Sequence, residues 1–204
     1  MCELVLVRHG ETVGQSSVRL YGATDVALSD LGRRQMARVR DALASERFDA
    51  VIASPLCRSR ESAEIVSGRA PVVVPGFREV SFGRWEGWTL AEVAQRDPDG
   101  DKERALGRDD YRYPDGESRL ELRQRIARAA VEHLDPPPRS ALAVLHKGVI
   151  KTLIATLTGL PYAEARDLPC ELGSIQRLRH EGGTWRLLVV GDTTHLGTDR
   201  LVGS

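Results

Sequence analysis

The stretch Leu4-Val5-Leu6-Val7-Arg8-His9-Gly10-Glu11-Thr12 decides how the rest of the chain is interpreted. Its branched apolar run ends abruptly in a basic pair and a glycine, which is typical of a buried strand. In open α/β sheets ligands bind beyond the carboxyl ends of strands, where Arg8 and His9 emerge. A guanidinium suits phosphate oxygens, a neutral imidazole is a nucleophile, and Gly10 allows close backbone approach. The stretch predicts a phosphoryl-binding strand end with a histidine nucleophile; a strand ending in two solvated polar residues is the alternative.

Composition narrows the class of protein. The 204 residues are 41% hydrophobic and 28% charged, with a formal net charge of zero, which suits one soluble domain spanning residues 1–204. A neutral total and no basic stripe argue against nucleic acid or a membrane surface as a partner. Cys2, Cys57 and Cys170 are odd in number and widely spaced, so we expect neither a disulfide framework nor a zinc site. With no signal segment and no membrane-length apolar run, we expect a cytoplasmic protein.

Predicted strands alternate with predicted helices along the chain. Apolar runs predict strands near residues 4–8, 49–53, 72–74, 142–145, 174–178 and 185–190. Helices are expected over 29–45 with Ser29 as N-cap, over 54–68 with Ser54 as N-cap, from 89, from 118 to the prolines at 136–138, and over 148–158. Residues 12–27 and 97–116 lack a period and are expected to be loops. The alternation predicts an α/β fold, a three-layer sandwich with a mostly parallel sheet and helices on both faces.

Two further stretches put polar residues at a strand end or helix start. In Ser54-Pro55-Leu56-Cys57-Arg58, Arg58 falls in the first turn of a helix, where the dipole favours anions. The alternative is that Arg58 and Arg60 only pair with nearby glutamates on a wet helix face; we favour this for Arg60 and phosphate for Arg58. His146 likewise follows a buried strand and precedes a helix. A lone histidine there is by default a hydrogen-bonded core residue, but its position matches that of His9.

The stretch from Phe77 to Gly87 sets carboxyl groups among apolar and aromatic residues, an environment that suits a general acid. Glu79 is the better candidate and Glu86 the lesser one. Taken alone, either residue is more often a surface carboxylate.

Together these motifs resemble the histidine phosphatase superfamily, the phosphoglycerate mutase-like family, on its phosphatase branch. The resemblance is carried by Leu-Val-Arg-His-Gly-Glu-Thr at 6–12 and its preceding strand, Ser-Pro-Leu-x-Arg at 54–58, Arg-Glu-x-x-Phe-Gly-x-Trp-Glu-Gly at 78–87, and the second strand-end histidine. It runs in order from Leu4 to about Leu196. It implies a phosphoglycerate mutase-like fold.

The resemblance also implies roles for individual residues. His9 takes the phosphoryl group as a covalent phosphohistidine, and Glu79 is the proton donor. Arg8, Arg58 and a protonated His146 clamp the equatorial oxygens, so that no metal and no cofactor is expected.

Several substrate contacts implied by the resemblance are altered here. Gln15 stands where many members have a phosphate-binding Asn, and Tyr21 and Gly22 fall where backbone amides often contact substrate. Leu145 and Lys147 flank the second histidine in place of the usual Ser or Thr and Gly, and Lys151 replaces a frequent Arg. We expect Lys147 to add a cation for a second anionic group of the substrate. Specificity is expected from the early loop and the 97–116 segment, with these candidates: Arg19, Tyr21, Tyr111, Arg112, Tyr113 and Lys147.

The sequence therefore predicts a phosphoric monoester hydrolase, a metal-independent phosphatase that hydrolyses a small phosphorylated metabolite such as a sugar phosphate. A bisphosphoglycerate-dependent phosphoglycerate mutase is the nearest alternative. The Phe82-Gly83-x-Trp85-Glu86-Gly87 block and the lack of a longer insertion typical of the mutases favour the phosphatase. A non-catalytic phospho-ligand-binding protein is a further alternative. The expected partner is a small phosphate ester; the oligomeric state stays open, with a homodimer as one option.

Overall fold

The computed structural model describes residues 2–201, and at its centre is a six-stranded sheet in the order β3-β2-β4-β1-β5-β6. The pairs from β3 to β1 are parallel, whereas β5 and β6 join the edge as antiparallel strands. The mostly parallel sheet is confirmed, and the predicted last two strands form a hairpin. The strands are β1 (Cys2–Arg8), β2 (Ala50–Ala53), β3 (Val72–Val73), β4 (Ser140–Leu145), β5 (Ile175–Glu181) and β6 (Thr184–Asp192).

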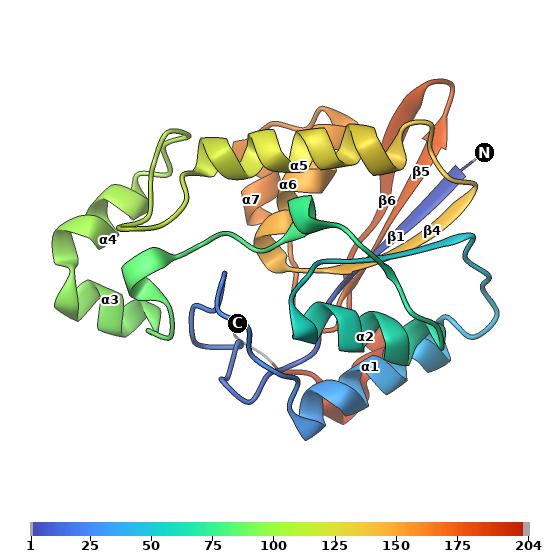
Figure 1. Cartoon of the computed structure of the whole chain (residues 1–204), viewed down its shortest axis with the longest axis horizontal. Coiled ribbons are helices and arrows are strands. Elements are labelled where there is room, and N and C mark those ends of the chain that lie inside the picture. Colours follow the sequence, from blue (N-terminus) through green and yellow to red (C-terminus); the bar gives the residue numbers. More distant parts are fainter. Residues whose placement is uncertain (1, 202–204) are drawn as a thin grey trace.

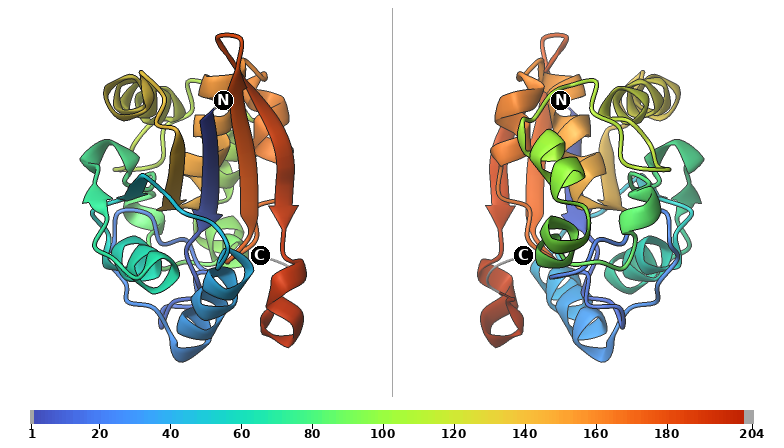
Figure 2. Two further views of the ribbon diagram at one scale, coloured as in Figure 1. Left: turned by 90° about the vertical axis from the view of Figure 1, so that its right-hand side faces the viewer. Right: turned by 90° about the vertical axis from the view of Figure 1, so that its left-hand side faces the viewer.

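Helices cover both faces of the sheet (Figure 1). On one face lie α1 (Asp30–Ala42) and α2 (Cys57–Ser67), and on the other lie α5 (Arg119–Leu134) and α6 (Lys147–Thr158), with α7 (Tyr162–Asp167) beside α6. The helices α3 (Leu90–Arg96) and α4 (Pro98–Ala105) project beyond one end of the sandwich in Figure 1, so they lie nearest the viewer in the right-hand view of Figure 2. Short 3₁₀ turns occur at Pro75–Phe77, Gly83–Trp85 and Thr194–Asp199. No helix within residues 2–201 has the length and apolarity needed to cross a bilayer.

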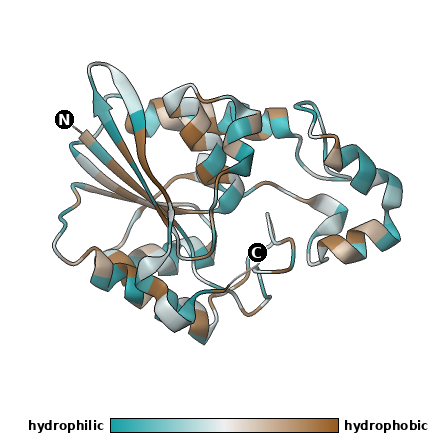
Figure 3. Cartoon of the chain, turned by 180° about the vertical axis from the view of Figure 1, so that it is seen from behind, coloured by the Kyte–Doolittle hydropathy of each residue, from teal (hydrophilic) through white to brown (hydrophobic). Residues whose placement is uncertain are grey.

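Strand β1 is buried on both of its faces, which explains its continuous apolar sequence. Successive strand residues point to opposite faces. Leu4 and Leu6 accordingly pack in the core under α5 and α6, while Val5 and Val7 pack in the core over α1 and α2. Each of the four is at most 2% exposed, and burying such a side chain contributes about 1.5–3 kcal/mol. Figure 3 shows this apolar character running along the strands of the sheet. This double burial fixes where β1 ends and therefore where Arg8 and His9 lie.

Most predicted helix ends are confirmed. Ser29 caps α1 by accepting a hydrogen bond from the Gly32 amide, and Thr89 and Ser118 form complete capping boxes at α3 and α5. Gly68 ends α2 in the left-handed conformation, with φ of 71°. The prediction of Ser54 as a helix N-cap is wrong, because α2 begins at Cys57 and the Ser54 hydroxyl instead bonds across the sheet to His146.

The expected loop over residues 97–116 contains helix α4. Asp97 caps it by accepting from the Gly100 amide, and Pro98 occupies the first turn. No residue of α4 is buried, so the segment carries no apolar stripe for periodicity to detect. The Asp-Pro pair is the signal that marks its start. The side chain of Asp97 also accepts from the indole of the fully buried Trp85 at 2.9 Å, which anchors the α3–α4 excursion.

Candidate active site

Two neighbouring parallel strands bring the two strand-end histidines together. Arg8 of β1 is in register with Leu145 of β4, and the His9 amide donates to the Leu145 carbonyl at 3.0 Å. His9 and His146 therefore leave the sheet side by side. Their imidazole centroids are 5.0 Å apart, with the ring planes inclined at 63°, and both residues are almost fully buried. The interpretation of a strand that ends in solvated polar residues is excluded.

The hydrogen bonding of His9 fixes which ring nitrogen is available. Its Nδ1 lies 2.7 Å from the carbonyl oxygen of Gly10. Because a carbonyl only accepts, Nδ1 carries the hydrogen and the lone pair stands on Nε2. Burial, and after it the charges of Arg58 and Arg8, lower the pKa of His9 well below its usual 6.5. Both observations favour a neutral imidazole with its lone pair on Nε2, the form that a nucleophile requires.

The same causes act on His146. Burial and the charges of Arg58, His9 and Arg8 lower the pKa of His146 well below 6.5. The expectation of a protonated His146 concerns the site with a bound phosphate and stays a prediction. Its Nε2 lies 2.6 Å from the Ser54 hydroxyl, and its buried Nδ1 has no hydrogen-bond partner.

Arg58 is held by carbonyls of the early loop and not by glutamates. It is fully buried in the first turn of α2, and its terminal nitrogens donate to the carbonyls of Tyr21, Gly22 and Thr24 at 2.8–3.1 Å. Arg60 is exposed. Arg8, 5% exposed, donates from its NH1 to the Cys170 carbonyl at 2.8 Å. The Nε atoms of both Arg8 and Arg58 are buried without a partner.

Glu79 docks on the N-terminus of α6, next to His146. One carboxyl oxygen accepts from the Val80 amide at 2.9 Å and the other from the Gly148 amide at 3.0 Å. A Cβ at Gly148 would lie 2.6 Å from Glu79 Oε1, so only glycine permits this approach. Sequence reasoning used Gly148 only as the start of a helix.

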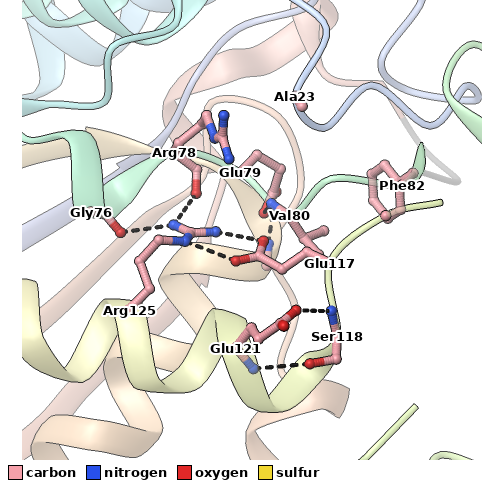
Figure 4. Close-up of polar contacts among 12 residues, drawn as sticks. Ala23, Gly76, Arg78, Glu79, Val80, Phe82, Glu117, Ser118, Glu121 and Arg125 are labelled. Carbon is pink, nitrogen blue, oxygen red and sulfur yellow. Dashed lines mark hydrogen bonds and ion pairs between the residues drawn. The ribbon is translucent and has the colours of Figure 1, made fainter. Parts of the chain in front are cut away.

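Figure 4 shows how the segment that carries Glu79 is fixed from the other side. The guanidinium of Arg125 on α5 donates to the carbonyls of Gly76 and Arg78 at 2.8 and 2.7 Å, and pairs with Glu117 at 2.7 Å. Both partners of this ion pair are less than 20% exposed. Arg125 was not predicted, because two of its three acceptor groups, the carbonyls of Gly76 and Arg78, are 49 and 47 residues away in sequence.

Glu86 has a structural part in the same site. Its carboxylate accepts from the amides of Phe82, Gly22 and Ala23 at 2.9–3.0 Å and from that of Thr24 at 3.3 Å. It therefore holds the loop whose carbonyls hold Arg58. The prediction that the Gly22 amide contacts substrate does not fit this arrangement, because that amide is bonded to Glu86; Tyr21 and Gly22 contribute their carbonyls to Arg58.

The remaining candidate substrate-binding and specificity residues lie outside the buried cluster, in three kinds of position. Lys147 and Tyr113 line a cavity beside Glu79, and burial, with Arg8, lowers the pKa of Lys147. Gln15 lies exposed on a turn with φ of 63° and is not part of the buried cluster. The other specificity candidates make structural contacts: Arg19 pairs with Glu92, Arg112 pairs with Glu121, and Tyr111 packs under Arg119.

Comparison with known proteins identifies the class of protein to which this fold and this pair of buried histidines belong. The family model for the histidine phosphatase superfamily (branch 1) matches residues 4–193. The chain belongs to this superfamily. It is 33% identical over 205 residues to a probable phosphoglycerate mutase GpmB of Erwinia tasmaniensis, covering 96% of this chain and 95% of that one.

Solved structures with the same fold are named as phosphatases. A putative α-ribazole-5′-P phosphatase from Escherichia coli superposes with a TM-score of 0.83 at 26% identity, covering 94% of this chain and 96% of that one. A mycobacterial glucosyl-3-phosphoglycerate phosphatase complexed with VO3 gives a TM-score of 0.83 at 29% identity, covering 95% of this chain and all of that one. The structural and sequence neighbours therefore include both phosphatases and mutases.

Proposed function

We propose that this protein is a phosphatase that hydrolyses a phosphomonoester through a phosphohistidine on His9. One observation carries the proposal. Of the six buried side-chain nitrogen and oxygen atoms without a hydrogen-bond partner in residues 2–201, three are Arg8 Nε, Arg58 Nε and His146 Nδ1. Buried polar groups are nearly always bonded, and a tetrahedral anion beside His9 would supply the acceptors that the two guanidinium groups lack.

The chemistry follows from these positions. His9 Nε2 attacks phosphorus in line, and the bond from phosphorus to the ester oxygen breaks. Arg8 and Arg58 spread the charge of the equatorial oxygens, and His146 Nδ1 binds one of them once it carries a hydrogen. Glu79 gives a proton to the leaving alkoxide and then takes one from the water that hydrolyses the phosphohistidine, which releases phosphate and restores His9.

Binding of the dianion also changes the charge balance at His146. Burial, and after it the charges of the two guanidinium groups, lower the pKa of both imidazoles. An incoming phosphate dianion neutralises that field, so protonation of His146 becomes favourable only in the complex. The proton for the clamp is thus taken up with the substrate.

Phosphoglycerate mutase is the second candidate, favoured by the relative of that name at 33% identity. It requires the same nucleophile and clamp but transfers the phosphoryl group back to substrate and not to water. Hydrolysis is supported by the phosphatase neighbours and by the Phe82-Gly83-x-Trp85-Glu86-Gly87 block. We further propose that the chain forms a single domain and acts in the cytoplasm. The three free cysteines support a reducing compartment.

Two measurements test the proposal. Intact-mass analysis of Glu79→Gln mixed with p-nitrophenyl phosphate, whose leaving phenolate needs no proton from Glu79, should show a trapped phosphoenzyme, which the His9→Ala variant cannot form. Absence of any phosphorylated species would refute the nucleophile. The second measurement compares free phosphate released from 3-phosphoglycerate with its conversion to 2-phosphoglycerate in the presence of bisphosphoglycerate. Isomerisation without phosphate release would make the protein a mutase.

A further inference from the structure

A cavity of about 340 Å³ adjoins the proposed proton donor. It lies among the α3–α4 excursion, the first turns of α5, and the helices α6 and α7, and Glu79 and Gly148 form part of its wall. Small-molecule sites have volumes of roughly 300–1,000 Å³. Because Glu79 must reach the oxygen that leaves with the alcohol, the group attached to that oxygen has to lie along this wall.

One part of the wall is apolar and aromatic. Its residues come from four separated segments: Leu20, Val80, Phe82, Leu90, Tyr113 and Leu122. Phe82 and Tyr113 pack edge to face, with centroids 5.0 Å apart, which presents a rigid aromatic surface. Leu90 is 47% exposed although large and apolar. A surface of this kind favours a flat apolar body over a small polyol.

The rest of the wall is strongly basic. Six cationic side chains line the cavity, against the carboxylates of Glu79 and Asp109, and Asp109 already pairs with Arg123. Lys147 and Lys151 are one turn apart on α6, so they share a face, and burial lowers the pKa of both. An excess of positive charge within a concave, partly desolvated wall attracts anions. The cavity therefore suits a ligand with a negative group in addition to the phosphate.

We propose that this cavity binds the leaving group, and that the substrates are phosphomonoesters of large alcohols that combine an apolar ring with a second anionic group. The proposal rests on the proposed function, since it assumes that Glu79 serves the leaving oxygen. It distinguishes this chain from an enzyme built for a substrate as small as phosphoglycerate, whose leaving group has no ring to cover the apolar wall.

The test uses three esters with leaving oxygens of matched acidity: ethyl phosphate, 2-(2-naphthyl)ethyl phosphate, and the latter with a carboxylate at ring position 6. We expect kcat/KM to rise about tenfold or more at each step. Equal values for all three esters, or a preference for ethyl phosphate or 3-phosphoglycerate, would overturn the proposal while leaving the phosphatase assignment intact. Failure to hydrolyse any ester would instead count against the proposed function.

Variants locate the effect in the cavity. Ala163, exposed on α7, lines it, so Ala163→Trp should fill it and lower kcat/KM for both naphthyl esters about tenfold or more, with ethyl phosphate unchanged. Ala94→Trp, a matched change at an exposed α3 position outside the lining, should affect none of them. Lys147→Met should remove most of the gain from the carboxylate while keeping that from the ring. If Ala163→Trp acts no differently from Ala94→Trp, the leaving group binds elsewhere.

Discussion

The buried cluster at the strand ends and the cavity beside it differ in how their side chains are held. In the cluster, the side chains of Arg58 and Glu79 are buried and bonded to main-chain groups of distant segments, Arg58 to carbonyls of the early loop and Glu79 to the Gly148 amide. Around the cavity the basic side chains are partly or fully exposed: Arg104 pairs with Asp101, and Arg166 donates to the Gly107 carbonyl. Main-chain partners within the sandwich leave a buried side chain little freedom, whereas surface ion pairs contribute only about 0–1 kcal/mol. We infer that chemistry is fixed in the first region and selectivity is adjustable in the second.

Loss of His9, the proposed nucleophile, should give the largest decrease in kcat. If it does not, the buried cluster is not the region that carries the chemistry. His9→Ala is expected to lower kcat roughly 10⁴- to 10⁶-fold, because nucleophile and clamp act as a unit. Steady-state phosphate release measures this, with circular dichroism to show that the fold persists. Activity within tenfold of the parent would mean that the reaction does not pass through His9.

Loss of one clamp guanidinium should come next. Arg58→Met removes the Nε donor that we propose binds the phosphate, together with the terminal donors that hold the early loop, and should lower kcat about 10²- to 10³-fold for every ester. The matched change at the exposed Arg60, Arg60→Met, should leave kcat unchanged. A decrease in kcat for bulky esters alone would mean that Arg58 contacts the leaving group and not the phosphate.

Displacement of the proton donor tests whether main-chain docking matters. Gly148→Ala places a Cβ 2.6 Å from Glu79 Oε1 and should lower kcat about 10²-fold, as small misplacements of catalytic groups do. Gly159→Ala, at the other end of α6, meets no atom within 4 Å but has φ of 74°. It should lower Tm and leave kcat unchanged. If both variants lower Tm and kcat alike, the effect of Gly148→Ala on kcat comes from lower stability and not from displacement of Glu79.

The pH dependence of stability should give the smallest effect. Burial lowers the pKa of His9 and of His146 below the 6.5 of the unfolded chain, so below pH 6.5 the unfolded state binds more protons. The contribution of the two histidines to the free energy of unfolding is complete above pH 6.5. It declines as the pH falls toward their pKa values in the folded state, by at most about 1.4 kcal/mol per pH unit for each histidine. Urea titrations between pH 7.5 and 5 should show this decrease in the free energy of unfolding. The decrease should be smaller in the double variant His9→Gln/His146→Gln and unchanged in the control variant His133→Gln. A parent protein with no slope would contradict the buried neutral imidazoles.

Glu86 and Ser54 show why some roles escaped sequence reasoning. Glu86 was the lesser candidate for an acid and instead holds the loop that holds Arg58. Ser54 is a good N-cap residue and precedes a proline, yet its hydroxyl accepts from the Leu56 amide and bonds to His146, 92 residues away. In both cases the side chain has a distant partner that only the tertiary fold brings near. Local propensity describes such a residue correctly but does not say which partner it will have.

The sequence by itself determined the alternation of elements, the strand ends that carry Arg8, His9 and His146, and the glycine and capping signals that end the helices. These follow from residue type and period, which act over a few positions. Only the tertiary structure decided the lowered pKa of His146, the docking of Glu79 on Gly148 and the cavity beside Glu79. Those features depend on burial and on contacts between segments far apart in the chain, and neither is a property of any short stretch.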